Sequence, residues 1–203
     1  MNKDYYLTLL EEGIREDNRG LFEKRKLSFK TNVIKNAEGS ALVKLGETLV
    51  IAGVKFSISE PFPDNPEQGI IVVDFDLSPV SHKDTPAELI PLEAEFARVI
   101  DRGIREGKVI DLNKLIIKKE ELVWLVNIDI VVLNNDGNVI DAGGIAALLA
   151  LANSYIPKFN KKTKKIEYNK KEKKLRINKI VLPFTYAKIR DKLLYDPNFI
   201  EES

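Results

Sequence analysis

Three arginines recur at spacings of four and three residues in the stretch EFARVIDRGIREGK, residues 95–108: Arg98, Arg102 and Arg105. If this stretch is an α-helix, with about 100° per residue, the three guanidinium groups lie within about 60° of one another. A guanidinium presents its N–H donors in a fixed fork that matches the oxygens of a phosphate. The spacing therefore fits a helix face that binds successive phosphates of one nucleic-acid strand.

The acidic neighbours of these arginines allow a second interpretation. Glu95 stands three residues before Arg98, and Asp101 and Glu106 flank the rest of the line. Residues three or four apart on a helix can form ion pairs. Spacing alone favours this second interpretation, a solvated and salt-bridged helix face.

A basic run in the last third of the chain is the other candidate for contact with nucleic acid. Residues 158–179 contain eleven lysines or arginines against Glu167 and Glu172. Neutralising several phosphates would give affinity that depends strongly on salt. Because lysines dominate and aromatic residues are few, the run is more typical of a solvated loop and edge strand, which lysines protect against aggregation.

Two further patterns are weaker. Gly143 and Gly144 in DAGGIAALL are predicted at a strand-to-helix junction, where backbone N–H groups can bind an anion. No Ser, Thr, Arg or Lys accompanies them, so close packing is the preferred explanation. Asp74 and Asp76 would point to the same side of a strand and could share a metal ion, but no third ligand is in view.

The composition excludes several classes of active site. The chain has no cysteine and a single histidine, His82, which is predicted to be a surface residue in the loop VSHKD. This excludes thiolate chemistry and sites built from several histidines. There is no P-loop, no GxGxxG and no GxSxG motif. By motif alone, nothing identifies an enzyme, and no cofactor is expected.

The charge balance and hydropathy give a broad class. The 203 residues are 44% hydrophobic, and 32 basic residues nearly balance 31 acidic ones, for a net charge of +1. This balance excludes a uniformly basic coat but permits a local basic surface. No run approaches the ~20 apolar residues of a membrane span, and the N-terminus does not resemble a signal peptide. We therefore expect a soluble, cytoplasmic protein with no membrane partner.

The helix that carries the arginines follows a series of predicted strands. A short amphipathic helix is predicted over 4–16, with its apolar face at Leu7, Leu10 and Ile14, and strands are predicted near 26–34, 40–47 and 48–58. A proline-rich loop leads to a strand at 70–80, whose apolar start predicts burial on both faces. The arginine helix is predicted from Pro86 or Ala87 to near Gly107, with an opposite, packed face. We assign to that face Leu92, Phe96, Val99, Ile100 and Gly103.

A second series of strands precedes a second helix. A long strand is predicted over 121–134, a hairpin turn at 134–137 and a return strand over 138–143. A buried helix over 143–156, two strands flanking 169–174 and a final hairpin ending near 197 follow. Strands followed by a helix therefore occur twice, which suggests an internal duplication. The pattern predicts an α+β fold with two layers and mixed sheets.

Four motifs, in order, resemble the RNase PH family. They are GIREDNRGLFEKRKLSF, AEGSALVKLGETLVIAGVKFSI, ARVIDRGIREGKVIDLNKL and DGNVIDAGGIAALLALAN. The similarity is best to the non-catalytic RNase PH-like subunits of the archaeal exosome and extends from about residue 10 to the C-terminus. It implies a single RNase PH-like domain over 1–203, of the ribosomal protein S5 domain 2-like fold.

The resemblance also implies partners and a function. In that family, three heterodimers of a catalytic and a non-catalytic subunit form a six-membered ring, to which cap proteins bind, and the ring degrades RNA from its 3′ end by phosphorolysis. The non-catalytic subunit completes the RNA cleft of its partner with arginines of the helix written here as ARVIDRGIRE. Arg98 is the first candidate for RNA contact, Arg102 the second and Arg105 the third. Glu95 and Asp101 would hold the line in place.

Departures from the catalytic pattern indicate that this chain is not itself an enzyme. Active members carry Ser or Thr followed by Arg where this chain has Gly143, Gly144 and Ile145. They also carry two aspartates after the last hairpin, where this chain reads DPNFIEES, with Glu202 or Ser203 near the first. In REDNRG, Asn18 replaces the usual glycine, and asparagine tolerates the left-handed backbone that the turn needs.

Length is a further departure. Family members continue for a strand pair and a long helix, so we expect the domain to be incomplete at its C-terminus. Either the sequence is a fragment, or a separate polypeptide supplies the missing element. Two alternatives to the exosome interpretation remain at this point: a divergent, active phosphorolytic 3′-5′ exoribonuclease, and an RNA-binding module of this fold without a ring.

Overall fold

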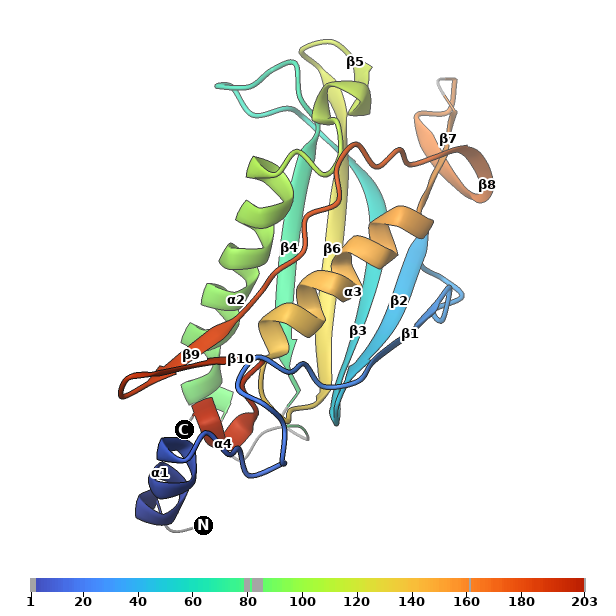
Figure 1. Ribbon diagram of the computed structural model, residues 1–203. Helices are drawn as coiled ribbons and strands as arrows, with labels where there is room; N and C mark the ends of the chain where they lie inside the picture. The colour runs from blue at the N-terminus through green and yellow to red at the C-terminus, as the bar shows by residue number, and fades with distance from the viewer. Residues whose placement is uncertain (1–2, 79–80, 82–85, 161, 203) are drawn as a thin grey trace.

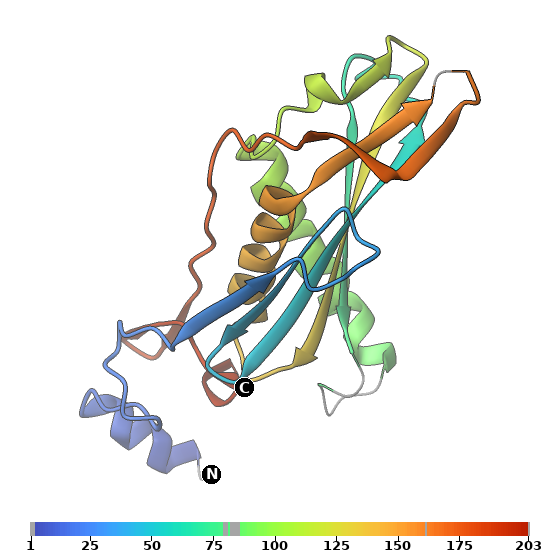
Figure 2. The same ribbon diagram turned by 90° about the vertical axis from the view of Figure 1, so that its right-hand side faces the viewer.

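The structure is a computed structural model that describes residues 3–78, 81, 86–160 and 162–202. Within these residues, a six-stranded sheet carries two long helices on one face (Figure 1, Figure 2). The strands of this sheet are β1 (Leu27–Thr31), β2 (Gly39–Leu45), β3 (Thr48–Ser59), β4 (Ile70–Leu77), β5 (Ile116–Lys118) and β6 (Leu122–Asn134). The two long helices are α2 (Pro86–Glu106) and α3 (Val139–Asn153).

Smaller elements surround this core. The helical ones are α1 (Lys3–Glu11), the 3-10 turn η1 (Leu112–Leu115) and α4 (Phe199–Glu202). Two hairpins form separate two-stranded sheets. One pairs β7 (Tyr155–Asn160) with β8 (Lys165–Lys174), and the other pairs β9 (Tyr186–Ile189) with β10 (Lys192–Tyr195). Within the described residues, no helix is both long and apolar enough to cross a membrane.

The strand order of the main sheet is β1-β2-β3-β6-β4, and β5 pairs with the start of β6. All of these pairs are antiparallel except β4 with β6, which is parallel. A parallel pair needs a crossover connection because the chain must return to the same end of the sheet. Helix α2 is part of that crossover, and it lies along β4 at the edge of the sheet.

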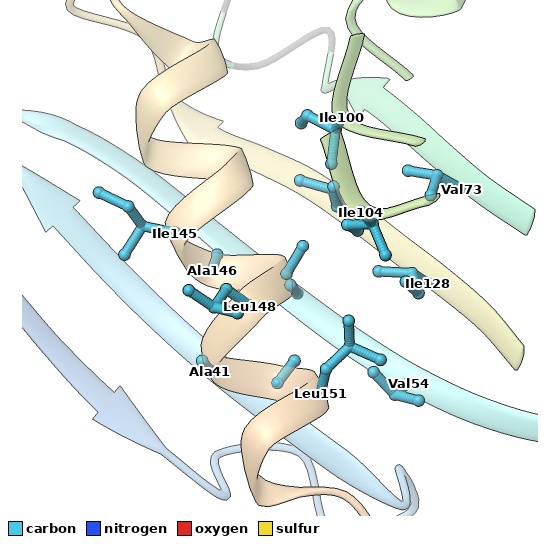
Figure 3. Packing of buried hydrophobic residues seen from close by; sticks show 14 of the residues in the cluster. Ala41, Val54, Val73, Ile100, Ile104, Ile128, Ile145, Ala146, Leu148 and Leu151 are labelled. Atoms are coloured by element: carbon cyan, nitrogen blue, oxygen red, sulfur yellow. The ribbon is translucent and has the colours of Figure 1, made fainter. Parts of the chain in front are cut away.

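The core lies between the sheet and the two long helices. The strands alternate, so β3 buries Val50, Ala52, Val54 and Phe56 while the residues between them are at most half-buried, apart from Gly53. Figure 3 shows Val54 and Ile128 of the sheet facing side chains of both helices. This arrangement fixes one face of α2 against the sheet and leaves the other face to the solvent.

Helix α3 is buried on almost all sides because its residues are apolar around its whole circumference. Small residues let it approach the sheet closely. A Cβ atom added to Gly143 would lie 2.8 Å from Cε2 of Phe75, and one added to Gly144 would lie 2.9 Å from Cγ of Pro183. The preferred explanation of these glycines, close packing, is confirmed.

The predicted α+β fold with two layers is confirmed, as are the bounds of α2 and the final hairpin. The return strand predicted over 138–143 is wrong, because these residues begin α3. Asn138 is the N-cap of that helix, with a left-handed backbone (φ 54°), and its side-chain oxygen accepts a hydrogen bond from the backbone N–H of Asp141. The two glycines therefore lie inside the helix and not at a strand-to-helix junction.

Four smaller predictions also need correction. Strand β4 is not buried on both faces, since Val72 is 37% exposed and the aspartates after it are exposed, as an edge strand with one open face allows. Helix α1 ends at Glu11 and leaves Ile14 exposed. The segment 169–174 is part of β8 and not a connection between strands. The short helix α4 follows the last strand, where no closing element was predicted.

Candidate nucleic-acid interface

Helix α2 presents Arg98 and Arg102 to the solvent and turns Arg105 toward the edge of the sheet. Ile100 and Ile104, 5% and 6% exposed, anchor the inner face against the core. Arg98 and Arg102 are exposed on the outer side. The predicted packed face is only partly right, because Leu92 and Val99 are each 43% exposed. The buried stripe of α2 is therefore narrower than the sequence pattern predicts.

Arg98 and Arg102 are the most accessible members of the line. The Arg98 side chain is 68% exposed, and its Nη1 atom donates a 3.1 Å hydrogen bond to Oε2 of Glu95. The guanidinium of Arg102 has no hydrogen bond or ion pair within the part of the chain that the structure describes. An exposed ion pair such as that of Arg98 is worth at most about 1 kcal/mol. Both guanidiniums therefore remain available to a phosphate at little cost.

Arg105 is held more firmly than the other two. Its Nε and Nη2 atoms donate to both carboxylate oxygens of Asp101, at 3.1 Å and 2.8 Å, and Nη2 also donates to the carbonyl oxygen of Ile71, at 3.1 Å. The hydrogen bond to Asp101 raises the pKa of Arg105 above its already high value, against the opposing effect of burial. Because Ile71 belongs to β4, Arg105 fastens the end of α2 to the sheet.

The structure thus separates the roles within the predicted line. Two ion pairs, Glu95 with Arg98 and Asp101 with Arg105, form as the sequence spacing predicted. The arrangement is an exposed pair of guanidiniums, Arg98 and Arg102, next to a third that is partly used in packing. Chemically, such a helix face can bind two neighbouring phosphates.

A second group of arginines was not predicted from the sequence. We call it the buried ionic cluster: Arg15, Arg19, Arg25, Asp196 and Glu201, all of whose side chains are at most 10% exposed. Arg25 Nη2 donates to Oδ1 of Asp196 at 2.8 Å, and Arg19 Nη1 donates to Oδ2 of the same carboxylate at 3.1 Å. The cluster connects the segment between α1 and β1 with Asp196, which follows β10, and with Glu201 of α4.

Arg15 is completely buried within this cluster. Its Nε atom donates to Oε1 of Glu201 at 2.8 Å, and Nη2 pairs with Oε2 of the same residue. Its remaining donors bind the carbonyl oxygens of Tyr195 and Asp196, at 2.8 Å and 2.9 Å. Tyr6 donates to Glu201 as well, and burial together with this hydrogen bond raises the pKa of Tyr6. These groups satisfy one another, so the cluster stabilises the fold and is not a phosphate site.

The turn at Asn18 belongs to the same region. Asn18 has φ 62°, so the left-handed backbone expected of the residue that replaces glycine there is confirmed. The only sequence signal for the cluster was the density of charge in GIREDNRGLFEKRK and DPNFIEE. Neither stretch reveals by itself that it pairs with the other.

Three carboxylates lie on the open face of the sheet. Asp74 and Asp129 are register partners on β4 and β6, and Asp76 follows on the same side of β4. Burial, with a contribution from Asp74, raises the pKa of Asp129. Within the described residues, no group of three or more potential metal ligands is present. His82 lies outside the described residues.

Comparison with known proteins identifies the family of this chain. Residues 23–157, which include α2 and α3, match the 3′ exoribonuclease family, domain 1, known as RNase PH. This chain belongs to the RNase PH family. The resemblance read from its four motifs is thereby confirmed.

Relatives within the RNase PH family are similar over nearly the whole chain. The exosome complex component Rrp42 of Pyrococcus abyssi is 43% identical over 203 residues, which cover 98% of this chain and 74% of that protein. The solved Archaeoglobus fulgidus exosome with RNA bound to the active site contains a chain of 40% identity and TM-score 0.89, covering 98% of this chain and 76% of that one. A chain of an archaeal exosome core has the same identity, a TM-score of 0.85, and coverage of 98% and 74%.

Proposed function

We propose that this chain is a non-catalytic, RNA-binding subunit of an archaeal-type exosome. The observation that carries the proposal is an exposed guanidinium pair, Arg98 and Arg102, on a helix fixed to the core, in a chain 43% identical to an exosome component. The partner would be a catalytic RNase PH-like subunit, with three heterodimers in a six-membered ring. That ring would shorten RNA from its 3′ end by phosphorolysis, carry cap proteins and act in the cytoplasm.

In this role, the chain positions the RNA strand and supplies positive charge to its phosphates. Arg98 and Arg102 would bind consecutive phosphates of the RNA strand and orient it toward the partner's active site, while Arg105 keeps the helix end on β4. Contacts to phosphates fix register and carry no base information. We therefore expect little sequence preference from this face.

The proposed lack of catalysis has a steric and an electrostatic basis. Phosphoryl transfer depends on donors and charges aimed at the phosphate oxygens. At the position where active relatives carry a hydroxyl and a guanidinium, this chain has Gly143, Gly144 and Ile145, and an added Cβ at either glycine would already collide with Phe75 or Pro183. Neither glycine offers a hydroxyl or a guanidinium to an anion, and a side chain added at either position would have to displace its neighbour.

The decisive experiment compares phosphate-dependent shortening of a 5′-labelled RNA by this chain alone, by the catalytic partner alone and by the mixture. We expect no activity from this chain alone and the highest activity from the mixture. Phosphorolysis by this chain alone would instead favour the alternative, a divergent active exoribonuclease.

The arginines are tested in the same mixture with Arg98→Ala/Arg102→Ala. RNA affinity should fall by roughly 1–3 kcal/mol, the range of charge-assisted hydrogen bonds at an exposed site, while ring size by light scattering stays unchanged. The matched control is Lys114→Ala/Lys118→Ala, which removes the same charge from exposed lysines in η1 and β5. An equal effect of both pairs would show that only net charge matters and would refute the arginine site.

A further inference from the structure

A hollow of about 500 Å³ lies at the opposite edge of the sheet from α2. The segment between β1 and β2, strand β3 and the β7–β8 hairpin form its walls, whereas α2 lies along β4 (Figure 1). The arginine line and the hollow are therefore separate surfaces. Tyr168 and Lys171 of the lysine-rich run 158–179, whose role the proposed function leaves open, line the hollow.

The hollow is basic. Lys35, Lys55 and Lys171 line it, with Glu38 as the only acidic side chain among the lining residues that the structure describes. Both oxygens of Glu38 are already used, one by Nζ of Lys55 at 2.8 Å and the other by the backbone N–H of Phe56 at 3.0 Å. Its side chain is 8% exposed, whereas that of Lys55 is 41% exposed. Lys55 also donates to the carbonyl oxygen of Asn36, at 3.0 Å, so its ammonium is held in place at the wall of the hollow, with Glu38 buried behind it.

Two tyrosine rings stand beside these ammonium groups. Nζ of Lys55 lies 4.5 Å from the ring centre of Tyr168, and Nζ of Lys171 lies 4.4 Å from that of Tyr155. These are cation–π distances, so each ammonium is favoured in a position next to an aromatic ring. Tyr168 remains 49% exposed. In each pair, the ammonium and the ring are close enough for a single nucleotide to contact both, with its phosphate on the lysine and its base on the ring.

This combination matches one chemical class best. Proteins bind single-stranded nucleic acids with a positive groove that follows the backbone and with aromatic side chains on which bases stack. An acidic peptide would use the lysines but gain nothing specific from the rings. The positive charge also continues along β8 through exposed lysines, so a chain of phosphates fits better than a single anion. These are Lys165, Lys173 and Lys174.

We propose that this hollow is a second site for single-stranded RNA, with phosphates on Lys35, Lys55 and Lys171 and bases on Tyr155 and Tyr168. The proposal rests on the RNA-binding role proposed above, and it names a contact that the arginine line does not supply. An RNA long enough to reach both edges of the sheet would be held at two places, and a short one at only one.

The site is located by photocrosslinking. A fluorescein-labelled oligouridine of about 20 nucleotides that contains 4-thiouridine is irradiated with the full chain, and the crosslinked peptides are mapped by mass spectrometry. We expect crosslinks to peptides that contain Tyr155 or Tyr168, and these must persist in Arg98→Ala/Arg102→Ala. Crosslinks confined to α2 would overturn the second site and leave the proposed function intact. Crosslinks at the tyrosines alone would overturn the arginine site and leave this one.

Salt dependence tests the lysines. For single strands, the slope of log affinity against log salt changes by about 0.7 per phosphate contact. Lys35→Gln/Lys171→Gln, at two exposed positions, should therefore reduce the slope in fluorescence anisotropy by about 1.4. Lys114→Gln/Lys118→Gln, with the same charge change elsewhere, should leave it nearly unchanged. Equal reductions in both variants would show non-specific attraction and overturn the proposal.

The tyrosines and a competitor complete the test. Tyr168→Leu should weaken binding roughly 5- to 160-fold, the range of base–aromatic stacking, whereas Tyr168→Phe, which keeps the ring, should bind as the natural chain does. Unlabelled oligouridine should displace the probe at much lower concentration than polyglutamate of the same length. If polyglutamate competes equally well, the hollow binds acidic chains in general and the RNA assignment is wrong.

Discussion

Arg15 gives the sharpest test of how the two ends of the described chain are held together. We predict that Arg15→Met, which keeps most of the side-chain volume, lowers the free energy of unfolding by about 3–5 kcal/mol. This is the usual cost of removing one partner of a buried ion pair, because the other charge is left without compensation. Here that charge is Glu201, which would keep only the hydroxyl of Tyr6, its local backbone donor and a distant Arg19, at 3.9 Å, and the carbonyl oxygens of Tyr195 and Asp196 also lose a donor.

The assay is urea unfolding followed by the fluorescence of Trp124, the only tryptophan, which is 6% exposed in the core. For a chain of this size, each kcal/mol corresponds to about 2–4 °C in Tm, so thermal unfolding should shift by about 6–20 °C. The control is Arg190→Met, which removes an exposed partner of Glu11 (58% and 62% exposed) and should cost at most about 1 kcal/mol.

A double-mutant cycle separates charge from packing. Glu201→Gln removes the stranded charge, so Arg15→Met/Glu201→Gln should be more stable than the sum of the two single losses predicts. If Arg15→Met costs no more than Arg190→Met, the cluster contributes no more than a surface pair. The reasoning from burial would then be refuted.

Two further predictions concern a buried carboxylate and the glycines of the long helices. Burial alone would raise the pKa of Asp196, but hydrogen bonds from Arg25 and Asn138 outweigh it and hold the pKa below its ordinary value. A depressed pKa stabilises the fold above the unfolded value, about 3.9, and that stability is lost as pH falls through the folded value. Asp196→Asn should therefore flatten the fall of Tm below about pH 4, and an unchanged slope would contradict this. Gly143→Ala should destabilise the fold by roughly 1–3 kcal/mol, because the added methyl group collides with Phe75. The higher helix propensity of alanine would offset up to about 1 kcal/mol of this loss. Gly103→Ala on α2, where an added Cβ meets nothing within 4 Å, should stabilise the chain in the same urea assay, and a loss there would contradict the packing argument.

Local patterns predicted most of the elements that position the candidate site. Helix α2 begins at Pro86 and ends before Gly107, as its first-turn proline and terminal glycine indicated. The position of β3 and the length of β6 were also predicted from the sequence. These features succeed because they depend on neighbours three or four residues away, or two residues away in a strand.

The errors come from contacts that are distant in sequence. The apolar, β-branched start of NVIDAG resembles a strand, but long-range hydrogen bonds fix Asn138 as a helix cap: its side chain donates to Asp196 and its backbone N–H donates to Glu202. The hydrogen bond from Arg105 to the carbonyl oxygen of Ile71 could not be predicted either, since every residue type has a backbone carbonyl and the acceptor is therefore not specified by the sequence. Sequence spacing could therefore place the arginines on one face but could not show which of them was already occupied.

The buried ionic cluster also bears on the order in which the chain folds. Arg15 and Glu201 are separated by 186 residues, so their contact can form only after a very long loop has closed. Contacts of this kind form slowly, because the entropy of loop closure is lost before the contact contributes any stability. The hairpin of β2 and β3, in contrast, joins residues that are close in sequence. The cluster should then be absent from the folding transition state. In that case the stability lost in Arg15→Met appears as faster unfolding at a nearly constant folding rate. The cluster would then slow the unfolding of the native state without affecting how fast it forms.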